Sequence, residues 1–291
     1  MLKRRQILLI SFLILVVRIG YGQESLDRAI DPEKEFQNVV YSLVIKDLKT
    51  GKYIQDFNGQ LDLIPASMVK ILTAASSLEK LGKDFQFTTH IHGQQEIING
   101  TNRNLISISS DGDPTLGSPK FGREGDIDSL VKLLQFAGIK KGDIIQVIDP
   151  PRNKPPAPSD WKYGDMGNYY ASGIFNFNFS DNLFKISFKQ SKNPGDPTII
   201  QNTTPSNLHF DLINSVITGP EGSGDNAYIH GAPYANKLFV SGSIPPGNGN
   251  FTIKGGDPQP SKTFINSLSK GLDIEGVELE LLDSKLAKDF D

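Results

Sequence analysis

The sequence predicts an α/β protein with more than one domain. Segments with the alternation of strands and segments with the periodicity of helices follow one another along the chain. Of its 291 residues 37% are apolar, so the chain can bury substantial cores, and its length suggests two or three domains. Proline and glycine are concentrated in three stretches, which we interpret as loops or crossings between subdomains: 149–158, 219–224 and 245–256.

The amino-terminal elements are expected to be a hairpin and a helix. Strands over residues 39–47 and 52–57 flank a turn at 49–51 that contains glycine. After a second turn, a helix is expected to reach Leu81 and to stop at Gly82. Four apolar residues of this helix recur at helical spacing and are expected to form one buried face: Ile71, Ala75, Leu78 and Leu81.

Strand and helix patterns continue beyond this first helix. The expected order is strand 87–92, strand 105–109, helix 127–137 and strand 143–149. The segment 137–144 also resembles the segment 272–278, because each follows a helix and leads through an isoleucine and a glycine into a strand. We therefore expect the two segments to be layers of one subdomain.

Alternating apolar residues predict a hairpin between residues 175 and 188. A period of two places one side of a strand in a core. The alternation is interrupted at 180–182, where we expect the tip of the hairpin. The alternating residues are Phe175, Phe177, Phe179, Phe184, Ile186 and Phe188.

Ser67 and Lys70 have the pattern of an activated serine. They stand three residues apart where the helix is expected to begin. The partial positive charge at a helix start disfavours an ammonium group, and a capping box would place Glu or Gln there. The pattern alone is weak, because it recurs where a lysine at a helix end or on a polar helix face needs no function: Ser77/Lys80, Ser129/Lys132 and Ser267/Lys270.

The position of Ser67 and Lys70 favours nucleophilic catalysis. Residues three apart share a helix face, so a neutral Lys70 amine can take the proton from the Ser67 hydroxyl as its oxygen attacks a carbonyl. Burial and a helix start both favour the uncharged form of an amine. The Ser67 amide suits one half of an oxyanion hole. The alternative interpretation is that Ser67 caps the helix and Lys70 is solvated.

The amino terminus predicts export. Basic residues at 3–5 precede an apolar run over 7–17, and small residues follow up to Gly22. We interpret residues 1–22 as a signal peptide, with an uncleaved anchor as the alternative, although the run is short for a bilayer. Cysteine is absent, which favours a bacterial-type periplasmic or surface location over a disulfide-stapled secreted module.

Charge and residue types argue against several functions. Removal of the signal would take four of the 30 basic residues, so the net charge would fall from −3 to about −7, which disfavours nucleic acid as a partner. His90 and His92 share a strand face without a carboxylate or a third histidine at ligand spacing, so neither a metal nor a cofactor is expected.

Three large aromatic residues, Trp161, Tyr169 and Tyr170, are interpreted as core residues.

Taken together, the motifs resemble the class C low-molecular-mass penicillin-binding proteins. Those proteins are D-alanyl-D-alanine carboxypeptidases and endopeptidases, and the similarity runs from about residue 35 to about residue 280. The motifs that carry it are Thr50-Gly51 in a hairpin, Pro65-Ala66-Ser67-x-x-Lys70, Leu81-Gly82, Gly112-Asp113-Pro114-Thr115-Leu116, Gly142-Asp143-Ile144 leading to Asp149, Gly242-Ser243-Ile244-Pro245 and Gly256-Asp257-Pro258.

The resemblance implies a multidomain α+β architecture. A β-lactamase/transpeptidase-like catalytic domain would be interrupted by a large inserted region of two smaller domains. The expected segments are 1–22 for the signal peptide, 23–85 for the amino-terminal part of the catalytic domain, 86–165 and 239–283 for inserted domain II, 166–238 for inserted domain III, and 284–291 for the return to the catalytic domain.

The resemblance also implies chemistry and partners. Ser67 would be the nucleophile, Lys70 the general base, and Asp149 a substrate-binding carboxylate in the inserted region. The substrates would be peptidoglycan stem peptides and β-lactams, met in the periplasm or cell envelope, with membrane contact only through the signal or anchor segment. The preference between carboxypeptidase and endopeptidase activity and the oligomeric state stay open.

Two further motifs of the family are not found in their expected context. A Ser-x-Asn motif and a Lys-Thr/Ser-Gly strand should follow the insertion. The chain contains Ser-x-Asn sequences at 180–182 and 191–193 and a Lys-Thr-Gly sequence at 49–51, but these lie at expected turns or loops. We therefore expect this stretch of chain to lack part of the machinery for full activity. The alternatives are a non-catalytic exported module that binds the cell wall and a serine β-lactamase.

Overall fold

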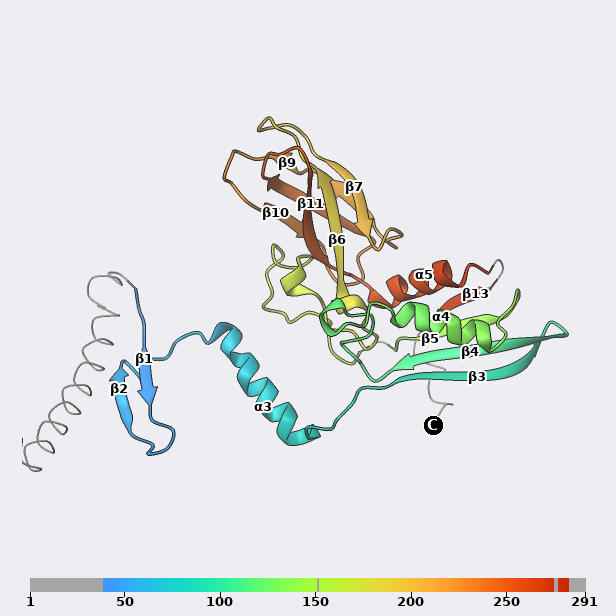
Figure 1. Ribbon diagram of the computed structural model, residues 1–291, viewed down its shortest axis with the longest axis horizontal. Coiled ribbons are helices and arrows are strands. Elements are labelled where there is room, and N and C mark those ends of the chain that lie inside the picture. The colour runs from blue at the N-terminus through green and yellow to red at the C-terminus, as the bar shows by residue number, and fades with distance from the viewer. Residues whose placement is uncertain (1–38, 151, 275–276, 283–291) are drawn as a thin grey trace, which may run out of the picture. The chain divides into compact units, whose positions relative to one another are not determined.

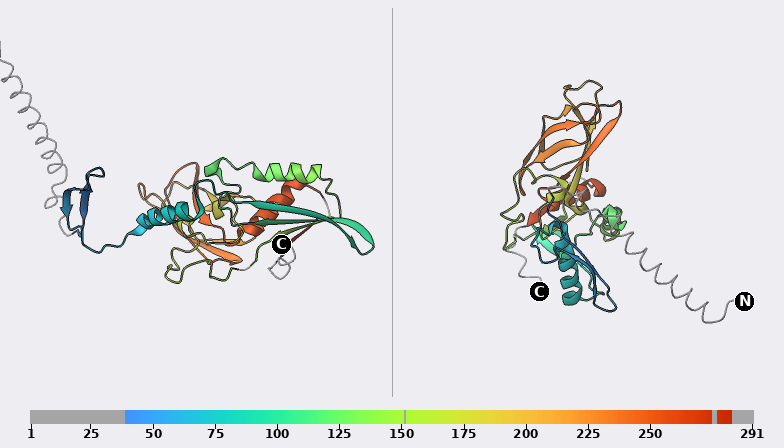
Figure 2. Two further views of the ribbon diagram at one scale, coloured as in Figure 1. Left: turned by 90° about the horizontal axis from the view of Figure 1, so that it is seen from below. Right: turned by 90° about the vertical axis from the view of Figure 1, so that its left-hand side faces the viewer.

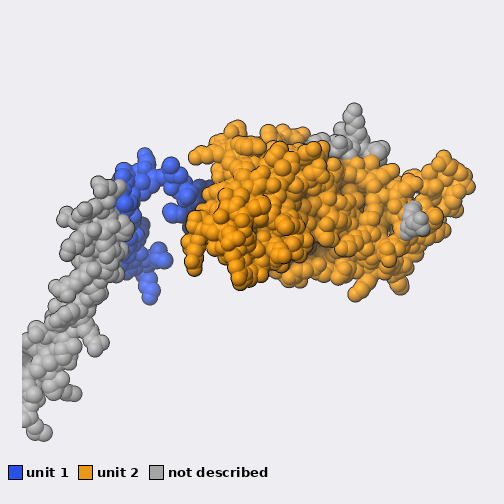
Figure 3. All heavy atoms as spheres, turned by 90° about the horizontal axis from the view of Figure 1, so that it is seen from above, with its two compact units in different colours: residues 1–83 blue, residues 84–291 orange. Residues whose placement is uncertain are grey.

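The structure is a computed structural model that describes residues 39–150, 152–274 and 277–282. The expected signal peptide and the expected segment 284–291 lie outside the described residues. The chain divides after Lys83 into two compact units, which Figure 3 colours separately. Within the part that is described, no helix combines the length and the apolar character needed to cross a membrane.

The first unit begins with a hairpin. Strands β1 (Leu43–Lys46) and β2 (Tyr53–Phe57) pair antiparallel. In the turn between them, the Thr50 amide donates a hydrogen bond to the Asp47 carboxylate at 3.0 Å. That bond is the main reason why the pKa of Asp47 lies below its ordinary value. Gly51 has φ +70°, which glycine adopts without a steric penalty, and the predicted turn is confirmed.

A short 3₁₀ turn, η1 (Ala66–Met68), leads into helix α3 (Val69–Leu81). The helix ends at Gly82, as predicted, and the Gly82 amide donates to the Leu78 carbonyl at 3.0 Å. None of the helix residues is buried, and Ile71 and Leu78 are 69% and 59% exposed. The expectation of a buried face is therefore wrong for the described first unit, because one hairpin is too little structure to cover a helix.

The second unit is built on a four-stranded mixed sheet of order β13-β5-β4-β3. Strands β3 and β4 form a long antiparallel hairpin, whereas β4, β5 and β13 run parallel (Figure 1). Strands β3, β4 and β5 correspond to strands predicted from the sequence. The bounds are β3 Thr89–Ile98, β4 Thr101–Ser110, β5 Ile144–Ile148 and β13 Glu278–Leu282.

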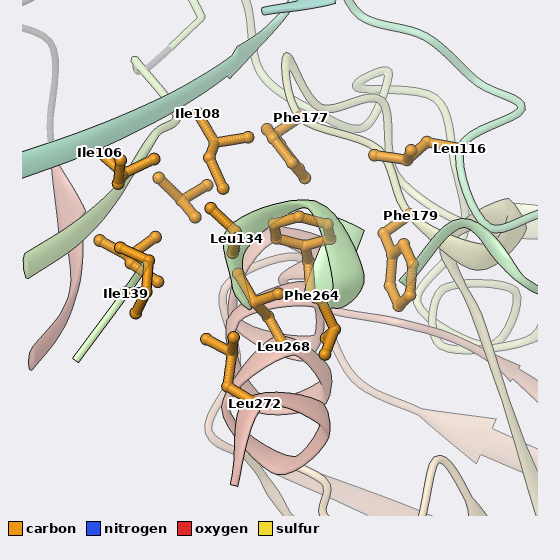
Figure 4. Close-up of a cluster of buried hydrophobic side chains, with 13 residues drawn as sticks. Ile106, Ile108, Leu116, Leu134, Ile139, Phe177, Phe179, Phe264, Leu268 and Leu272 are labelled. Carbon is orange, nitrogen blue, oxygen red and sulfur yellow. The ribbon is translucent and has the colours of Figure 1, made fainter. Parts of the chain in front are cut away.

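Helices α4 (Asp126–Phe136) and α5 (Pro260–Leu272) pack side by side against this sheet (Figures 1 and 2). Helix α4 agrees with the predicted helix 127–137. Together with the strands, the two helices enclose the first core, shown in Figure 4. Its side chains with at most 1% exposure are Ile108, Leu134, Ile145, Val147, Phe177, Phe264 and Leu268. Burial of each such side chain stabilises the fold by about 1.5–3 kcal/mol.

The internal similarity of the chain has a structural counterpart. Strands β5 and β13 each follow one of the two packed helices, and they are neighbours in register, with Ile144 beside Glu278. The Glu278 amide donates to the Asp143 carbonyl at 3.0 Å, just before the register begins. The strands that follow the two similar segments are therefore neighbours in one sheet, and the expectation that the segments form separate layers is wrong.

Between β5 and α5 the chain forms two small sheets around a second core. One sheet has the order β12-β6-β7, and the other has the order β10-β11-β8 with β9 beside β11. Phe184, Ile186, Ile229 and Val240 are fully buried between them. The bounds are β6 Leu183–Lys189, β7 Ile199–Thr204, β8 Asp211–Asn214, β9 Ile217–Thr218, β10 Asn226–His230, β11 Lys237–Ile244 and β12 Asn250–Gly256.

The predicted hairpin over 175–188 is wrong. Only its second arm is a strand, β6, and this strand pairs with β12 and β7. The first arm is irregular: Phe177 and Phe179 enter the first core, while the Asn178 side-chain amide donates to the Gly112 carbonyl at 3.0 Å. The alternation thus arises because phenylalanines fill a core while asparagines bind neighbouring loops.

The turn Ser180–Asn182 has an uncommon backbone. Its three residues have φ of 52°, 58° and 53°, a left-handed region that costs roughly 1–2 kcal/mol for most non-glycine residues. Buried hydrogen bonds of Asn182 offset this cost: its Oδ1 accepts from the Phe179 amide at 3.1 Å and its Nδ2 donates to Asn178 Oδ1 at 2.8 Å. The Asn182 carbonyl also accepts from the Asp257 amide at 2.8 Å, across the base of the second core.

Asp143 joins the turn before β5 to the neighbouring strand. Its fully buried carboxylate accepts hydrogen bonds from the Asn104 backbone and side-chain amides, at 2.9 and 2.8 Å, and from the Lys140 amide at 2.9 Å. Burial is the largest influence and raises the pKa of Asp143, but these hydrogen bonds outweigh it. The pKa therefore lies below the ordinary value of 3.8.

Replacement of Asn182 by alanine is expected to destabilise the second unit. The change leaves buried groups without partners, which costs about 1–3 kcal/mol. Asn193→Ala is the matched control, because Asn193 ends the other Ser-x-Asn sequence but is exposed, and its effect should stay within about 0.5 kcal/mol. Chemical denaturation measures both, and equal effects would contradict the structural role of Asn182.

Asp143→Asn should reveal an acid-sensitive contribution to stability. Because the folded pKa of Asp143 lies below 3.8, its contribution is fully present above that pH and is lost as the pH falls through the folded pKa. The difference in unfolding free energy between the wild type and the variant should therefore be large at neutral pH and shrink in acid. Denaturation curves across this range measure it, and a constant difference would refute the assignment.

Candidate functional site

The structure brings Ser67 and Lys70 together. Lys70 Nζ donates a hydrogen bond to Ser67 Oγ at 2.9 Å. Ser67 lies in η1 and Lys70 in the first turn of α3, so both positions agree with the sequence prediction. The two side chains share one side of the helix start, which is the geometry that proton transfer between them requires.

The backbone immediately before Ser67 is also uncommon. Ala66 has φ +45°, in the left-handed region that costs an alanine roughly 1–2 kcal/mol. The turn is closed by the Met68 amide, which donates to the Pro65 carbonyl at 2.9 Å. Backbone outliers of this kind cluster at functional sites, so the conformation of Ala66 is in keeping with a catalytic role for the next residue.

Lys70 has no acidic neighbour within the first turn of its helix. The helix start adds its own partial positive charge. In the described first unit, both Ser67 and Lys70 are exposed. The burial expected for Lys70 is therefore not found there, because the hairpin and the helix leave the site open.

Asp149 belongs to the second unit, directly after β5. Its Oδ1 accepts a hydrogen bond from the Phe177 amide at 3.3 Å, and its own amide donates to the Leu282 carbonyl at 3.3 Å. The residue is half-buried. Its carboxylate thus has a structural partner at the end of the sheet, whereas Ser67 and Lys70 lie in the first unit.

An open pocket of about 490 Å³ borders the loop that follows Asp149. Asp111, Arg152 and Asn176 contribute polar side chains to its lining. The Asn176 side-chain amide donates to the Pro150 carbonyl at 2.6 Å and so holds the pocket wall to Pro150. Sequence reasoning missed these residues, because they come from three separate loops and no motif links them.

One residue of the pocket lining, Asp111, makes a side-chain contact that was not expected. His90 Nε2 lies 3.4 Å from Asp111 Oδ1, although the sequence showed no carboxylate at ligand spacing from the histidine. The pairing follows from the antiparallel register of β3 and β4, which places the strand ends beside each other. Among the described residues, no group of three or more His, Cys, Asp or Glu side chains is arranged to hold a metal ion.

Tyr169 and Tyr170 are not core residues. They are 56% and 53% exposed and line a second open pocket of about 480 Å³. The interpretation as core is wrong because the buried positions of this turn are taken by Asn168 and Ala171. Trp161, the third residue of that expectation, is only half-buried.

Comparison with known proteins shows similarity over most of the chain. The sequence profile of the D-Ala-D-Ala carboxypeptidase 3 (S13) family matches residues 23–281. A D-alanyl-D-alanine carboxypeptidase of Actinomadura sp. (strain R39) is 23% identical over 271 residues, which are 90% of this chain and 48% of that protein. The carboxypeptidase DacB of Haemophilus influenzae is 27% identical over 176 residues, 60% of this chain and 35% of that protein.

Solved structures show the same fold. The crystal structure of penicillin binding protein 4 (dacB) from Haemophilus influenzae has a TM-score of 0.61 and 22% identity, and the match covers 83% of this chain and 52% of that one. A structure of that protein complexed with a novel β-lactam has a TM-score of 0.58, 22% identity, and coverages of 87% and 53%. The chain spans about half the length of these structures.

Proposed function

The chain belongs to the D-Ala-D-Ala carboxypeptidase 3 (S13) family, and from this membership we propose that it carries the nucleophile of a serine-type carboxypeptidase acting on peptidoglycan stem peptides. The observation that carries the proposal is the 2.9 Å hydrogen bond between Lys70 Nζ and Ser67 Oγ at the start of α3. Of the five Ser-x-x-Lys sequences in the chain, this one combines a helix start with a left-handed residue before the serine.

In the proposed reaction, Ser67 Oγ attacks the carbonyl carbon of the penultimate D-alanine of the stem. Lys70, with its amine neutral, accepts the hydroxyl proton as the bond forms. The peptide C–N bond then breaks, and the terminal D-alanine leaves as an amine that takes up a proton. Water attacks the resulting ester, and this step releases the shortened stem and restores the Ser67 hydroxyl. Endopeptidase cleavage of a cross-link would follow the same steps with a larger leaving amine.

Penicillin binding follows from the same chemistry. Attack of Ser67 on a β-lactam carbonyl opens the ring and leaves a covalent acyl-enzyme, because the leaving amine stays tethered to the acyl group. The Haemophilus relative in complex with a β-lactam supports this part of the proposal.

We propose that Asp149 binds the amino group of a stem-peptide side chain. The position of Asp149 beside the pocket lined by Asp111 and Asn176 supports this role. The hydrogen bond from the Phe177 amide fixes the orientation of the Asp149 carboxylate, so this carboxylate would bind the ligand without reorienting.

The proposed architecture is a transpeptidase-like domain that begins before α3 and is interrupted by an inserted region. The boundary between the compact units lies after Lys83, two residues from the expected boundary at 85, and supports this division. The proposed location is the periplasm or cell envelope, where peptidoglycan is accessible. The basic and apolar amino-terminal segment supports export.

Fluorescent penicillin should label Ser67. The test uses the product of the complete gene, so that any motif outside residues 1–291 is present, and intact-mass analysis with peptide mapping locates the adduct. Ser67→Ala should abolish labelling, because the nucleophile is removed. Ser77→Ala is the matched control, since Ser77 begins the other Ser-x-x-Lys sequence of α3, and it should label normally. Absence of an adduct on Ser67 would refute the proposal.

Lys70→Gln should slow acylation while Ser67 remains present. General base catalysis contributes about 10²–10⁴-fold to such reactions, so the labelling rate should fall by a factor in this range. Lys80→Gln provides the control on the same helix and should leave the rate unchanged. If the labelling rate of Lys70→Gln equals that of the wild type, another group accepts the proton.

Hydrolysis of nitrocefin by the wild type tests the alternative function. Fast turnover would favour a β-lactamase.

A further inference from the structure

Three tyrosines of the second unit line one open pocket of about 480 Å³. Tyr169, Tyr170 and Tyr228 are 56%, 53% and 49% exposed. The first two lie in the 3₁₀ turn η3 (Tyr169–Ala171), and the third lies in β10. Several aromatic rings gathered at one exposed hollow are typical of binding sites, because Tyr combines an apolar face with a polar tip.

The turn that carries two of these rings is firmly held. Asn168 is 5% exposed, and its side chain exchanges two hydrogen bonds with the backbone of Ile229 in β10, at 3.0 and 3.1 Å. Asn168 also forms a bridge to Gly255 in β12. The rings of Tyr169 and Tyr170 contact each other edge to face, with centroids 5.3 Å apart. The backbone that carries Tyr169 and Tyr170 is therefore held in place without a ligand, which lowers the entropy cost of binding.

The polar groups around the rings suit a neutral ligand rich in hydroxyl groups. The pocket rim contains one carboxylate, Asp225, and one ammonium group, Lys254, together with the hydroxyl of Thr252. The Tyr170 hydroxyl donates to Asp165 Oδ1 at 3.4 Å, and burial, followed by the charge of Asp165, raises the pKa of Tyr170. The phenol thus remains neutral at physiological pH. The lining itself thus carries one group of each charge.

We propose that this tyrosine pocket, formed by Tyr169, Tyr170, Tyr228, Asp225, Thr252 and Lys254, binds a saccharide chain. The apolar C–H faces of pyranose rings pack on aromatic rings, and their hydroxyl and amide groups can bond to the rim. The assignment of the saccharide as the amino-sugar glycan of peptidoglycan rests on the proposed function. Binding there would hold the glycan strand while the stem peptide is processed.

The test measures binding of chitotetraose, a chain of N-acetylglucosamine units, by calorimetry with the full chain. Saturable binding is expected. Tyr169→Ala and Tyr228→Ala should each raise Kd by about 3- to 10-fold, as expected for loss of one stacking ring. Tyr169→Phe should bind nearly as well as the wild type, because it keeps the ring. Circular dichroism and thermal unfolding verify that each variant is folded.

Matched controls distinguish binding in the tyrosine pocket from binding elsewhere on the protein. Tyr163→Ala removes a tyrosine that is 62% exposed but does not line the pocket, and it should leave Kd unchanged. Ser67→Ala should also bind normally, so a failed penicillin adduct and failed saccharide binding are distinguishable results. Three outcomes would overturn the proposal: no saturable binding at millimolar sugar, equal effects of Tyr163→Ala and Tyr228→Ala, or competition by a sugar-free stem peptide.

Discussion

The buried amide of Asn182 is the interaction on which both cores of the second unit depend. The residue stands between Phe179, which fills the core under the sheet, and β6, which begins the core of the two small sheets. Its side chain bonds to both Phe179 and Asn178, and it thereby holds a left-handed turn that the backbone alone would avoid. An unpaired amide at this depth would destabilise the fold, so the packing of the cores and the pairing of this side chain require each other.

Elements with strong local signals were predictable from the sequence. The turn held by Asp47, the end of α3 at Gly82, and the positions of α4 and β5 follow from glycine, polar side chains and periodicity within a few residues. The adjacency of Ser67 and Lys70 was predictable for the same reason, since one helical turn determines it. The order of the strands within each small sheet was not predictable, because it depends on contacts between distant segments.

The errors share a physical cause. The alternation around Phe177 has the period of a strand, but the intervening asparagines bind loops instead of pairing with a neighbouring strand. Tyr169 has a large aromatic side chain of the kind often found in cores, yet the neighbouring Asn168 occupies the buried position. Likewise, the pocket near Asp149 is lined by residues from separate loops, and its polar groups converge only through tertiary structure. In each case contacts with distant segments decided the structure, such as those of Asn178 with Gly112 and of Asn168 with Ile229.

The hydrogen bond between the Asp257 amide and the Asn182 carbonyl has a consequence for the evolution of the fold. Because Leu183 at the start of β6 pairs with Gly256 at the end of β12, the two ends of the segment 183–256 are neighbours. A segment with adjacent ends behaves as a cassette, which can be lengthened, shortened or exchanged without breaking the continuity of the parent domain. The helices and parallel strands can therefore persist in descendants in which this segment presents quite different surfaces.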